Sequence, residues 1–377
     1  MKITNIKKIP AGKYLFISIE TDEGITGIGE IGVWGYLDAA AAMLDCISTD
    51  LIGMDPMRIE HIVNYLYRGY YFRGTVIMSV ISAIDIALWD IKGKKYGVPI
   101  YDLLGGKTRD KIRTYAPVFG KTVDEMVNGC LERKRQGFTA ARLVMPYLTD
   151  DAENHPTYNG KVSLCIRCVQ ACREATGEEF DLILEVHRGM TVPEAIAFAR
   201  GVEACHPLFL EDPIPPDCEP AMVNVANHIN IPIATGERAI NIQEIGTLLS
   251  RHGAQYIRPD VCVVGGISAA KKIASISEAH YAGIVPHNPL GPVSTAACLQ
   301  LDMCIPNFLI QEYPSFNLEG NEDGMLREPL KTANGFLFVP DAPGLGIELI
   351  PDISEKFPPN QRKAKIRIAN DGSVSDR

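Results

Sequence analysis

The sequence contains three apolar runs that each end in a glutamate: Asp181-Leu-Ile-Leu-Glu185, Leu208-Phe-Leu-Glu211 and Ile231-Pro-Ile-Ala-Thr-Gly-Glu237. The glutamates are 26 residues apart in both steps. Runs of this length are typical of buried parallel strands. Carboxylates at the ends of such strands are costly and repel one another unless a cation compensates them, and all-oxygen ligands favour Mg²⁺ over zinc. The stretch therefore predicts neighbouring parallel strands and a Mg²⁺ site.

Composition narrows the class of protein. A chain of 377 residues suits a barrel plus a second domain. The net charge of −9 and the lack of a basic block argue against a nucleic-acid partner. Residues 1–8 lack the apolar core of a signal peptide, and Asp85 interrupts the best membrane candidate, residues 76–89. Ten cysteines without paired spacing favour the reducing cytoplasm, so we expect a cytoplasmic protein that does not bind membranes.

The first part of the chain mixes strand and helix patterns. Residues 14–20 and 25–31 flank a turn and predict a β-hairpin, while residues 36–50, 58–66 and 79–95 predict helices. The second hairpin arm contains Gly27-Ile-Gly29-Glu-Ile-Gly32, which matches a dinucleotide-binding motif. That motif needs a strand before it and a helix opening at its end, whereas these glycines lie within the arm. A glycine-rich strand packed against another backbone is the alternative interpretation.

After Ile112 apolar runs alternate with helical windows. Eight runs predict strands, at residues 113–118, 139–145, 181–187, 207–213, 231–237, 254–260, 283–287 and 307–313. The helix-sized gaps between them exclude hairpins, and eight such units predict a (β/α)₈ TIM barrel of the α/β class. A longer insertion, residues 146–159, follows the second strand.

Polar residues cluster at the ends of these strands, where the active sites of such barrels lie. In chain order they are Arg142, Glu185, His187, Glu211, Glu237, Asp260, His287 and Glu312. One of them alone could be a structural contact, but a stable barrel does not need a whole ring of ionisable groups at one mouth. The ring therefore predicts an active site.

A family resemblance becomes specific in these motifs. They are Glu185-Val-His187, Glu211-Asp-Pro213, Gly236-Glu237-Arg238, Arg258-Pro-Asp260, Gly265-Gly-Ile267, Pro286-His287-Asn288 and Gln311-Glu312-Tyr313. Together they resemble the enolase superfamily, within it the mandelate racemase subgroup, and most closely acid-sugar dehydratases of the galactonate dehydratase type. The resemblance implies an α+β capping domain at residues 1–112, a catalytic barrel at 113–325 and a C-terminal segment at 326–377 that returns to the cap. It also implies an even-numbered homo-oligomer.

The resemblance implies a Mg²⁺-dependent dehydration of a sugar acid, such as galactonate or gluconate, to a 2-keto-3-deoxy acid. Glu185, Glu211 and Glu237 would hold Mg²⁺, which stabilises the enediolate formed by loss of the α-proton. The other roles are His287 as base, Asp260 as its partner, His187 as general acid for the departing β-hydroxyl, and Glu312, in protonated form, as hydrogen-bond donor to the intermediate. His187 lies two residues after Glu185, which would place both side chains on one side of the strand.

Two positions depart from the family pattern. Glu185 stands where the subgroup most often has Asp, and the extra methylene moves the carboxylate by about 1.5 Å. The second strand has Arg142 and no lysine, and arginine is a poor proton acceptor, which favours one-base dehydration over racemisation. The alternatives are a racemase, epimerase or cycloisomerase on the same metal site, an inactive sugar-acid-binding barrel and, more remotely, a nicotinamide dehydrogenase.

Substrate-contacting residues are predicted at Arg142 and in the cap, at Trp34, Tyr36, Tyr71 and Arg73. The segment 67–74 is rich in aromatic residues and arginine, so it could line a pocket or be a loop docked on the core. Tyr147, His155 and Tyr158 of the insertion are further acid–base candidates. Cys165, Cys168 and Cys172 mimic cluster-ligand spacing, but they lie in a helical window and predict a packed face instead.

Overall fold

A computed structural model of the chain describes residues 1–148, 157–314, 324–360, 366–368 and 372–375. It begins with a three-stranded antiparallel sheet of β1 (Ile3–Ala11), β2 (Tyr14–Thr21) and β3 (Thr26–Glu30). The predicted hairpin is confirmed as β2 and β3, in which Phe16 is opposite Glu30. Strand β1 was not predicted.

Helices cover this sheet to complete the cap. They are α1 (Leu37–Leu51), α2 (Ile59–Gly69), α3 (Thr75–Tyr96) and the short α4 (Ile100–Leu103), and the first three confirm the predicted helices. Helix α3 is buried on most of its circumference because it packs against β2 and β3 as well as α1, α2 and a barrel helix, α10 (Gly266–Ala279). Such all-round burial explains its apolar sequence.

The glycines of the dinucleotide-like motif are explained by this packing. A Cβ atom at Gly27 would lie 2.1 Å from the carbonyl oxygen of Ala87, and one at Gly29 would lie 2.0 Å from that of Ala83. Only glycine allows β3 to approach the α3 backbone so closely. The alternative interpretation of a strand packed on another backbone is therefore confirmed.

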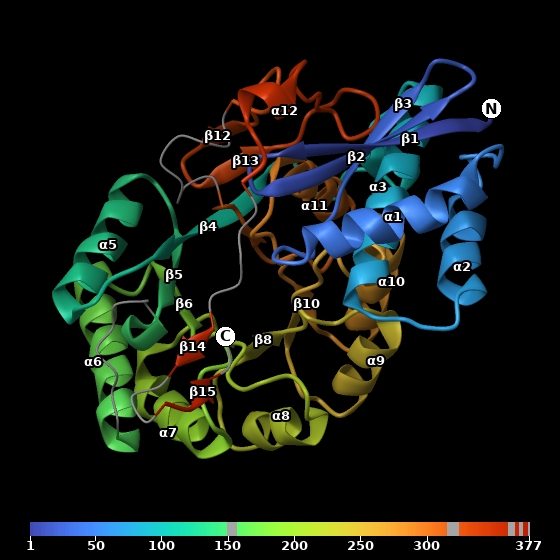
Figure 1. Cartoon of the computed structure of the whole chain (residues 1–377). Coiled ribbons are helices and arrows are strands. Elements are labelled where there is room, and N and C mark those ends of the chain that lie inside the picture. Colours follow the sequence, from blue (N-terminus) through green and yellow to red (C-terminus); the bar gives the residue numbers. More distant parts are fainter. Residues whose placement is uncertain (149–156, 315–323, 361–365, 369–371, 376–377) are drawn as a thin grey trace.

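Eight parallel strands form a barrel below the cap (Figure 1). They are β4 (Ile112–Val118), β5 (Ala140–Val144), β6 (Asp181–Glu185), β7 (Phe209–Glu211), β8 (Ile233–Thr235), β9 (Tyr256–Ile257), β10 (Gly283–Ile284) and β11 (Gln311–Glu312). Each lies within a predicted run or overlaps it. Strands β4 to β10 pair in chain order, and β11 pairs with β4. A parallel bridge between Ile284 and Phe308 closes the ring, which confirms the TIM-barrel prediction.

Helices connect the strands and surround the barrel (Figure 1). They are α5 (Val123–Arg135), α6 (Tyr158–Thr176), α7 (Val192–Val202), α8 (Glu219–Ala226), α9 (Ile242–Ser250), α10 (Gly266–Ala279) and α11 (Pro292–Cys304), with 3₁₀ turns at Pro146–Leu148 and Glu203–Cys205. Cys165, Cys168 and Cys172 are fully buried on one face of α6, which confirms a packed face. No helix in the described parts of the chain is long and apolar enough to cross a membrane.

The segment that follows the barrel returns to the cap. Its elements are β12 (Lys331–Ala333), β13 (Phe336–Phe338) and α12 (Ile353–Lys356). The last two strands, β14 (Arg367–Ile368) and β15 (Val374–Ser375), pair with each other in a separate two-stranded sheet and lie apart from the cap, at the level of the barrel (Figure 1). Strand β13 pairs antiparallel with β4. A bridge then links Gly344 to Pro99, and the carbonyl of Phe357 accepts a hydrogen bond of 2.9 Å from the amide of Gly12. These contacts tie the cap to the barrel along both ends of the sequence.

Candidate active site at the mouth of the barrel

The three glutamates lie on adjacent strands at the carboxyl-terminal rim of the barrel. Glu185 is the last residue of β6 and Glu211 the last of β7, and the two stand opposite each other in the parallel register. Glu237 follows β8 by two residues. All three side chains are at most 9% exposed. Parallel pairing thus brings together residues that are far apart in the sequence.

Arg142 of β5 lies among these carboxylates. One of its terminal nitrogens, Nη1, is 3.5 Å from Glu185 Oε2, 3.1 Å from Glu211 Oε1 and 2.8 Å from Glu312 Oε1. Burial opposes the charge of the guanidinium, but Glu312 and Glu211 outweigh that effect and raise the pKa of Arg142. The residue is therefore a fixed cation at the mouth.

A second arginine, Arg258, forms the floor of the site. Its side chain follows β9 and is fully buried. Nη2 lies 2.9 Å from both Glu211 Oε1 and Glu312 Oε2, and Nη1 donates to the Tyr115 hydroxyl over 2.8 Å. The sequence prediction used Arg258 only as part of a motif. A charged residue directly after a buried strand was the available signal for this role.

His287 and Asp260 lie side by side on neighbouring strand ends. A parallel bridge joins the two residues, and His287 Nδ1 is 2.9 Å from Asp260 Oδ2. The other ring nitrogen, Nε2, is 3.4 Å from Glu237 Oε2. Burial lowers the pKa of His287, but the charge of Glu237 and the hydrogen bond with Asp260 outweigh it and raise that pKa to about 9. The imidazole thus has one fixed partner on each side.

The backbone after β6 differs from the expected strand. Strand β6 ends at Glu185, and His187 and Arg188 have φ values of 45° and 64°, so side-chain alternation does not extend to His187. The amide of His187 donates to the Glu185 carboxylate. Asp212 is also left-handed, with φ of 40°. Such strained residues persist where surrounding contacts fix them, and they are common at functional sites.

Arg188 supplies these fixing contacts and was missed by the sequence prediction. Its Nη1 donates to the Glu237 carboxylate and lies 3.0 Å from Asp212 Oδ2. Its Nη2 lies 2.9 Å from His187 Nε2. A single buried arginine therefore joins the ends of β6, β7 and β8. Its position next to His187 in the sequence was the only signal.

The protonation of Glu312 differs from the sequence-based expectation. Burial raises its pKa, but Arg142 and Arg258 dominate and lower it to about 2. Glu312 is therefore ionised in this arrangement, whereas a hydrogen-bond donor role requires the protonated acid. The reason is that two arginines, neither foreseen at this carboxylate, bracket it.

The charges in this cluster are unbalanced. If all six carboxylates are ionised and His287 is neutral, they face three guanidinium groups and leave an excess of three negative charges. The carboxylates are Glu185, Glu211, Asp212, Glu237, Asp260 and Glu312, and the cations are Arg142, Arg188 and Arg258. Burial and the neighbouring charge of Glu211 raise the pKa of Glu185, the expected result for like charges held together.

The donor set fits a divalent cation by its chemistry. It consists of carboxylate oxygens with excess negative charge, and Glu211 Oε2 is buried without a hydrogen-bond partner among the described residues. In the described part of the chain, however, no three His, Cys, Asp or Glu side chains close on one point, because Arg142 and Arg188 hold Glu185, Glu211 and Glu237. A cation there would require these pairs to rearrange.

The predicted substrate contacts in the cap differ in their burial. Tyr36 is 62% exposed and Tyr71 is 99% exposed. The guanidinium of Arg73 stacks on the Tyr67 ring at 4.2 Å and donates to the Tyr67 carbonyl over 3.2 Å. Trp34 is partly buried and packs against a hydrophobic cluster that has members from both the cap and the barrel. Among the four predicted residues, Trp34 is therefore the one that packs against this core.

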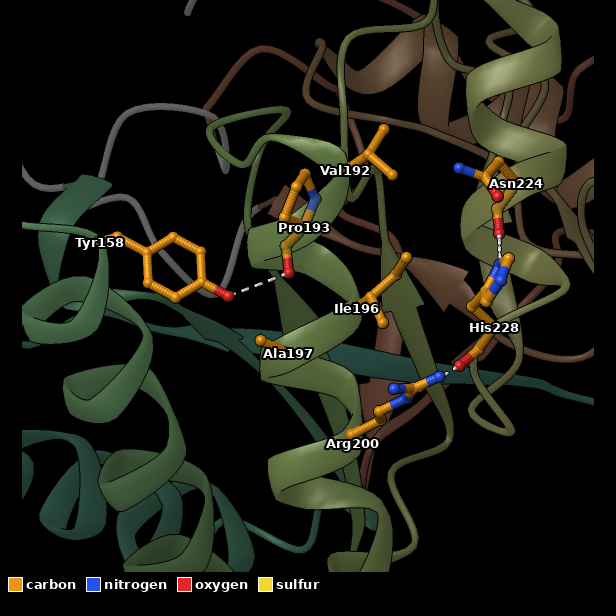
Figure 2. A pocket seen from close by; sticks show the side chains of 8 residues that line it. All are labelled: Tyr158, Val192, Pro193, Ile196, Ala197, Arg200, Asn224 and His228. Atoms are coloured by element: carbon orange, nitrogen blue, oxygen red, sulfur yellow. Dashed lines mark hydrogen bonds between the residues drawn. The ribbon is translucent and has the colours of Figure 1, made fainter.

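Residues of the insertion after β5 also lie at different places. The Tyr147 hydroxyl donates to the Val186 carbonyl over 3.1 Å, next to the end of β6. Tyr158 lies over a depression on the outside of the barrel, and its hydroxyl donates to the Pro193 carbonyl over 3.3 Å (Figure 2). None of the rim carboxylates lines this depression. His155 falls outside the described residues.

Comparison with known proteins agrees with this architecture. Residues 3–105 match the mandelate racemase / muconate lactonizing enzyme N-terminal domain, and residues 125–353 match the enolase C-terminal domain-like family. D-galactonate dehydratase of Pectobacterium atrosepticum is 35% identical, with all of both chains covered. A D-galactonate dehydratase family member of Streptomyces bingchenggensis is 33% identical over 97% of this chain and 95% of its own.

Solved structures show the same fold. An enolase from Agrobacterium radiobacter, solved with bound Na and L-malate, has a TM-score of 0.91 and 29% identity over 99% of both chains. A member of the enolase superfamily from Salmonella Typhimurium has a TM-score of 0.90 and 31% identity, over 94% of this chain and 98% of its own. The chain therefore belongs to the mandelate racemase / muconate lactonizing enzyme family of the enolase superfamily.

Proposed function

We propose that this protein is a hydro-lyase, a Mg²⁺-dependent dehydratase that converts a sugar acid, such as galactonate or gluconate, to a 2-keto-3-deoxy acid. The observation that carries the proposal is the convergence of a carboxylate cluster and the His287–Asp260 pair at one barrel mouth. The relatives named D-galactonate dehydratase, matched over the full chain, support the substrate class.

Glu185, Glu211 and Glu237 are the residues that would hold the metal. Bound there, Mg²⁺ supplies Lewis-acid stabilisation of the negative charge that develops on the substrate carboxylate. Arg142 and Arg258 remain cations throughout, because arginine does not lose its proton in proteins. Arg142 would contact the oxygens of the substrate, and the ionised Glu312 would orient both guanidinium groups.

His287 would accept the α-proton at Nε2. Asp260 fixes Nδ1 as the protonated nitrogen through the 2.9 Å contact, so Nε2 presents its lone pair. A pKa of about 9 would keep the free imidazole protonated, and the Glu237 charge is the largest cause of that increase. A positive charge that neutralises Glu237 removes the largest of the effects that raise the pKa of His287, and so brings that pKa down from about 9 toward the range of a competent base.

His187 would act as the general acid. The bond from the α-carbon to its proton breaks first, and the proton goes to His287. The bond from the β-carbon to its hydroxyl then breaks, and the hydroxyl leaves as water with a proton from His187. The resulting enol tautomerises to the 2-keto-3-deoxy acid. In this structure Arg188 Nη2 lies 2.9 Å from His187 Nε2 and can only donate to it, so the ring would have to leave this contact to carry the proton that it gives to the hydroxyl.

Racemisation is less well supported by this site. It needs a second base on the opposite face of the α-carbon, and β5 offers Arg142 at the equivalent strand end, paired with three carboxylates.

All ten cysteines are free, which supports a reducing compartment such as the cytoplasm. We also propose a homo-oligomer, which size-exclusion chromatography with light scattering would test.

A screen of the purified protein with Mg²⁺ against aldonates and aldarates tests the proposal. We expect one or a few substrates to yield 2-keto-3-deoxy acids, and no product in excess EDTA. A screen without product would contradict dehydration. Exchange of the α-proton with solvent deuterium would then separate a racemase or epimerase, which exchanges it, from a barrel that only binds sugar acids.

A further inference from the structure

A carboxylate from the cap holds the loop that carries His287. Glu30 is the last residue of β3 and is fully buried. Its Oε1 accepts a hydrogen bond of 2.7 Å from the Gly291 amide, and its Oε2 accepts one of 2.8 Å from the Ser294 amide. These amides lie at the start of α11, whose first N–H groups have no partner within the helix. The carboxylate thus fixes the β10–α11 connection from outside the barrel.

A short chain of hydrogen bonds runs from this contact into the active site. Ser294 Oγ donates to Asn288 Oδ1 over 2.8 Å, and Asn288 Nδ2 donates to Thr295 Oγ1 over 2.8 Å. The backbone N–H of Asn288 donates to Glu312 Oε2 over 3.1 Å. Asn288 directly follows His287 in the sequence. Each of these atoms is buried, so a displacement at Ser294 has no solvent to absorb it.

Two glycines set the position of Glu30. A Cβ atom on Gly29 would lie 2.0 Å from the Ala83 carbonyl oxygen, so β3 is locked against α3. A Cβ atom on Gly291 would lie 2.8 Å from Glu30 Oε1, so only glycine leaves room for the carboxylate there. Strand β3 of the cap and the β10–α11 connection of the barrel therefore pack closely against each other at the side chain of Glu30.

We propose that Glu30 is a positioning residue through which the cap holds His287 and Glu312 in their working arrangement. The proposal rests on the proposed function, because it concerns the base of that reaction. A small displacement of a reacting group costs a large factor in rate, whereas substrate binding depends on many contacts. Loss of the Glu30 contact therefore lowers kcat more than it changes KM.

Asp85 provides a matched control within the same cap. It is also fully buried, and its Oδ1 accepts a hydrogen bond of 3.1 Å from the Ser268 amide at the start of α10. Both carboxylates thus dock the cap on the first turn of a barrel helix. None of the described hydrogen bonds of Asp85 leads to His287 or Glu312. Asp85→Asn reports the general cost of weakening the docking of the cap.

The test compares Glu30→Gln, Ser294→Ala and Asp85→Asn with the wild type. In Glu30→Gln the side-chain NH₂ group replaces one of the two accepting oxygens, so two donors face each other and one hydrogen bond is lost. We therefore expect kcat to fall roughly 10- to 100-fold, with KM within about threefold of the wild type. Ser294→Ala keeps the Glu30 contacts but removes the step to Asn288, so kcat falls in the same direction. Asp85→Asn leaves kcat within about threefold. In the double variant of Glu30 and Ser294, the loss is smaller than the product of the single losses.

Equal kcat losses in Glu30→Gln and Asp85→Asn, with additive effects of Glu30 and Ser294, would overturn the proposal. If Glu30→Gln does not fold, as shown by circular dichroism, Ser294→Ala against Asp85→Asn decides the matter. Glu30→Asp, which keeps the charge with shorter reach, should recover part of the activity lost in Glu30→Gln.

A readout that needs no substrate separates this proposal from the proposed function. The ring ¹⁵N chemical shifts of His287, assigned with His287→Asn, are measured at one fixed pH. We expect them to change in Glu30→Gln and Ser294→Ala and to stay as in the wild type in Asp85→Asn. Unchanged shifts in all three variants would overturn the positioning role even if the enzyme dehydrates sugar acids. Changed shifts without any dehydration would contradict only the proposed function.

Discussion

The rim of the barrel and the cap loop between α2 and α3 were both predicted to contact substrate, yet they are organised differently. At the rim, Glu185 and Glu211 are held opposite each other by strand pairing and buried beside arginines. In the cap loop, Tyr71 and Phe72 are 99% and 87% exposed. Residue type alone does not create a site. Side chains converge on one site where strand pairing and buried hydrogen bonds fix the position of each of them.

The buried carboxylates of the two regions also differ. At the rim, guanidinium groups outweigh burial and lower the pKa of Glu312 to about 2. In the cap, burial dominates and raises the pKa of both Glu30 and Asp85 to about 7, because they meet mainly backbone amides. Glu312 therefore keeps its charge at neutral pH, whereas the two cap carboxylates are poised to take up a proton. This difference can be tested at single positions.

The largest expected effect is at the base. His287→Asn keeps a polar side chain beside Asp260 but cannot accept the α-proton, so kcat should fall about 1000-fold or more. Magnesium affinity, measured by calorimetry, should stay near that of the wild type because His287 is not a proposed ligand. Elimination at the wild-type rate would remove His287 from the mechanism and weaken the view that the rim is the reactive region.

The next effect is on stability. Arg258→Met removes the fully buried cation between Glu211 and Glu312 and leaves two carboxylates less compensated. Breaking a buried ion pair on one side costs about 3–5 kcal/mol, which urea unfolding would measure. Arg258→Lys keeps the charge and should lose less. A Met variant as stable as the wild type would show that the rim does not depend on its arginines.

The fold and the list of rim residues could be predicted because both depend on sequence periodicity. Each apolar run had the length of a strand, and the ends of parallel strands must meet at one rim. Glu185, Glu211, Asp260 and His287 therefore came together from position alone. Strand β1 was missed because its burial pattern does not alternate regularly and two adjacent lysines, Lys7 and Lys8, interrupt its apolar residues.

The contacts among those residues could not be predicted. The turn of the backbone at His187 depends on the three-dimensional fit of Arg188 against Asp212 and Glu237, not on a local pattern. The ionised state of Glu312 likewise depends on two arginines from β5 and β9 that are distant in the sequence. Electrostatic effects of this kind exist only once the strands are paired.

A pH dependence of stability should distinguish the cap. The pKa of Asp85 rises from 3.8 to about 7 on burial, so the folded protein binds this proton more tightly than the unfolded chain. The contribution of Asp85 to stability is then present at low pH and is lost as pH rises through about 7. We expect wild-type stability to lose roughly 2–3 kcal/mol more than Asp85→Asn between pH 5 and pH 8 in urea unfolding. Parallel pH profiles of the two proteins would contradict the assigned pKa.

A smaller effect is expected for metal binding. Glu211→Gln removes a carboxylate charge at the rim, where Glu211 Oε2 is buried without a hydrogen-bond partner among the described residues. The dissociation constant for Mg²⁺ should increase at least about tenfold, as measured by calorimetry without substrate. Glu219→Gln on α8, outside the rim, is the control and should bind Mg²⁺ like the wild type. An unchanged affinity in Glu211→Gln would remove this residue from the proposed ligands.

The smallest effect is expected in the cap loop, and it tests the comparison from the other side. Tyr71 is almost fully exposed, so Tyr71→Ala should change the free energy of unfolding by less than about 0.5 kcal/mol. If the loop keeps this position when substrate binds, kcat and KM should stay within about threefold of the wild type. A KM increase of tenfold or more with unchanged stability would show instead that the loop closes over the substrate. The exposed aromatic residues would then be a binding surface that forms only when the ligand is present. The rim and the cap would differ in when they form, because the rim is already arranged in the free protein and the cap loop becomes ordered around the substrate on binding.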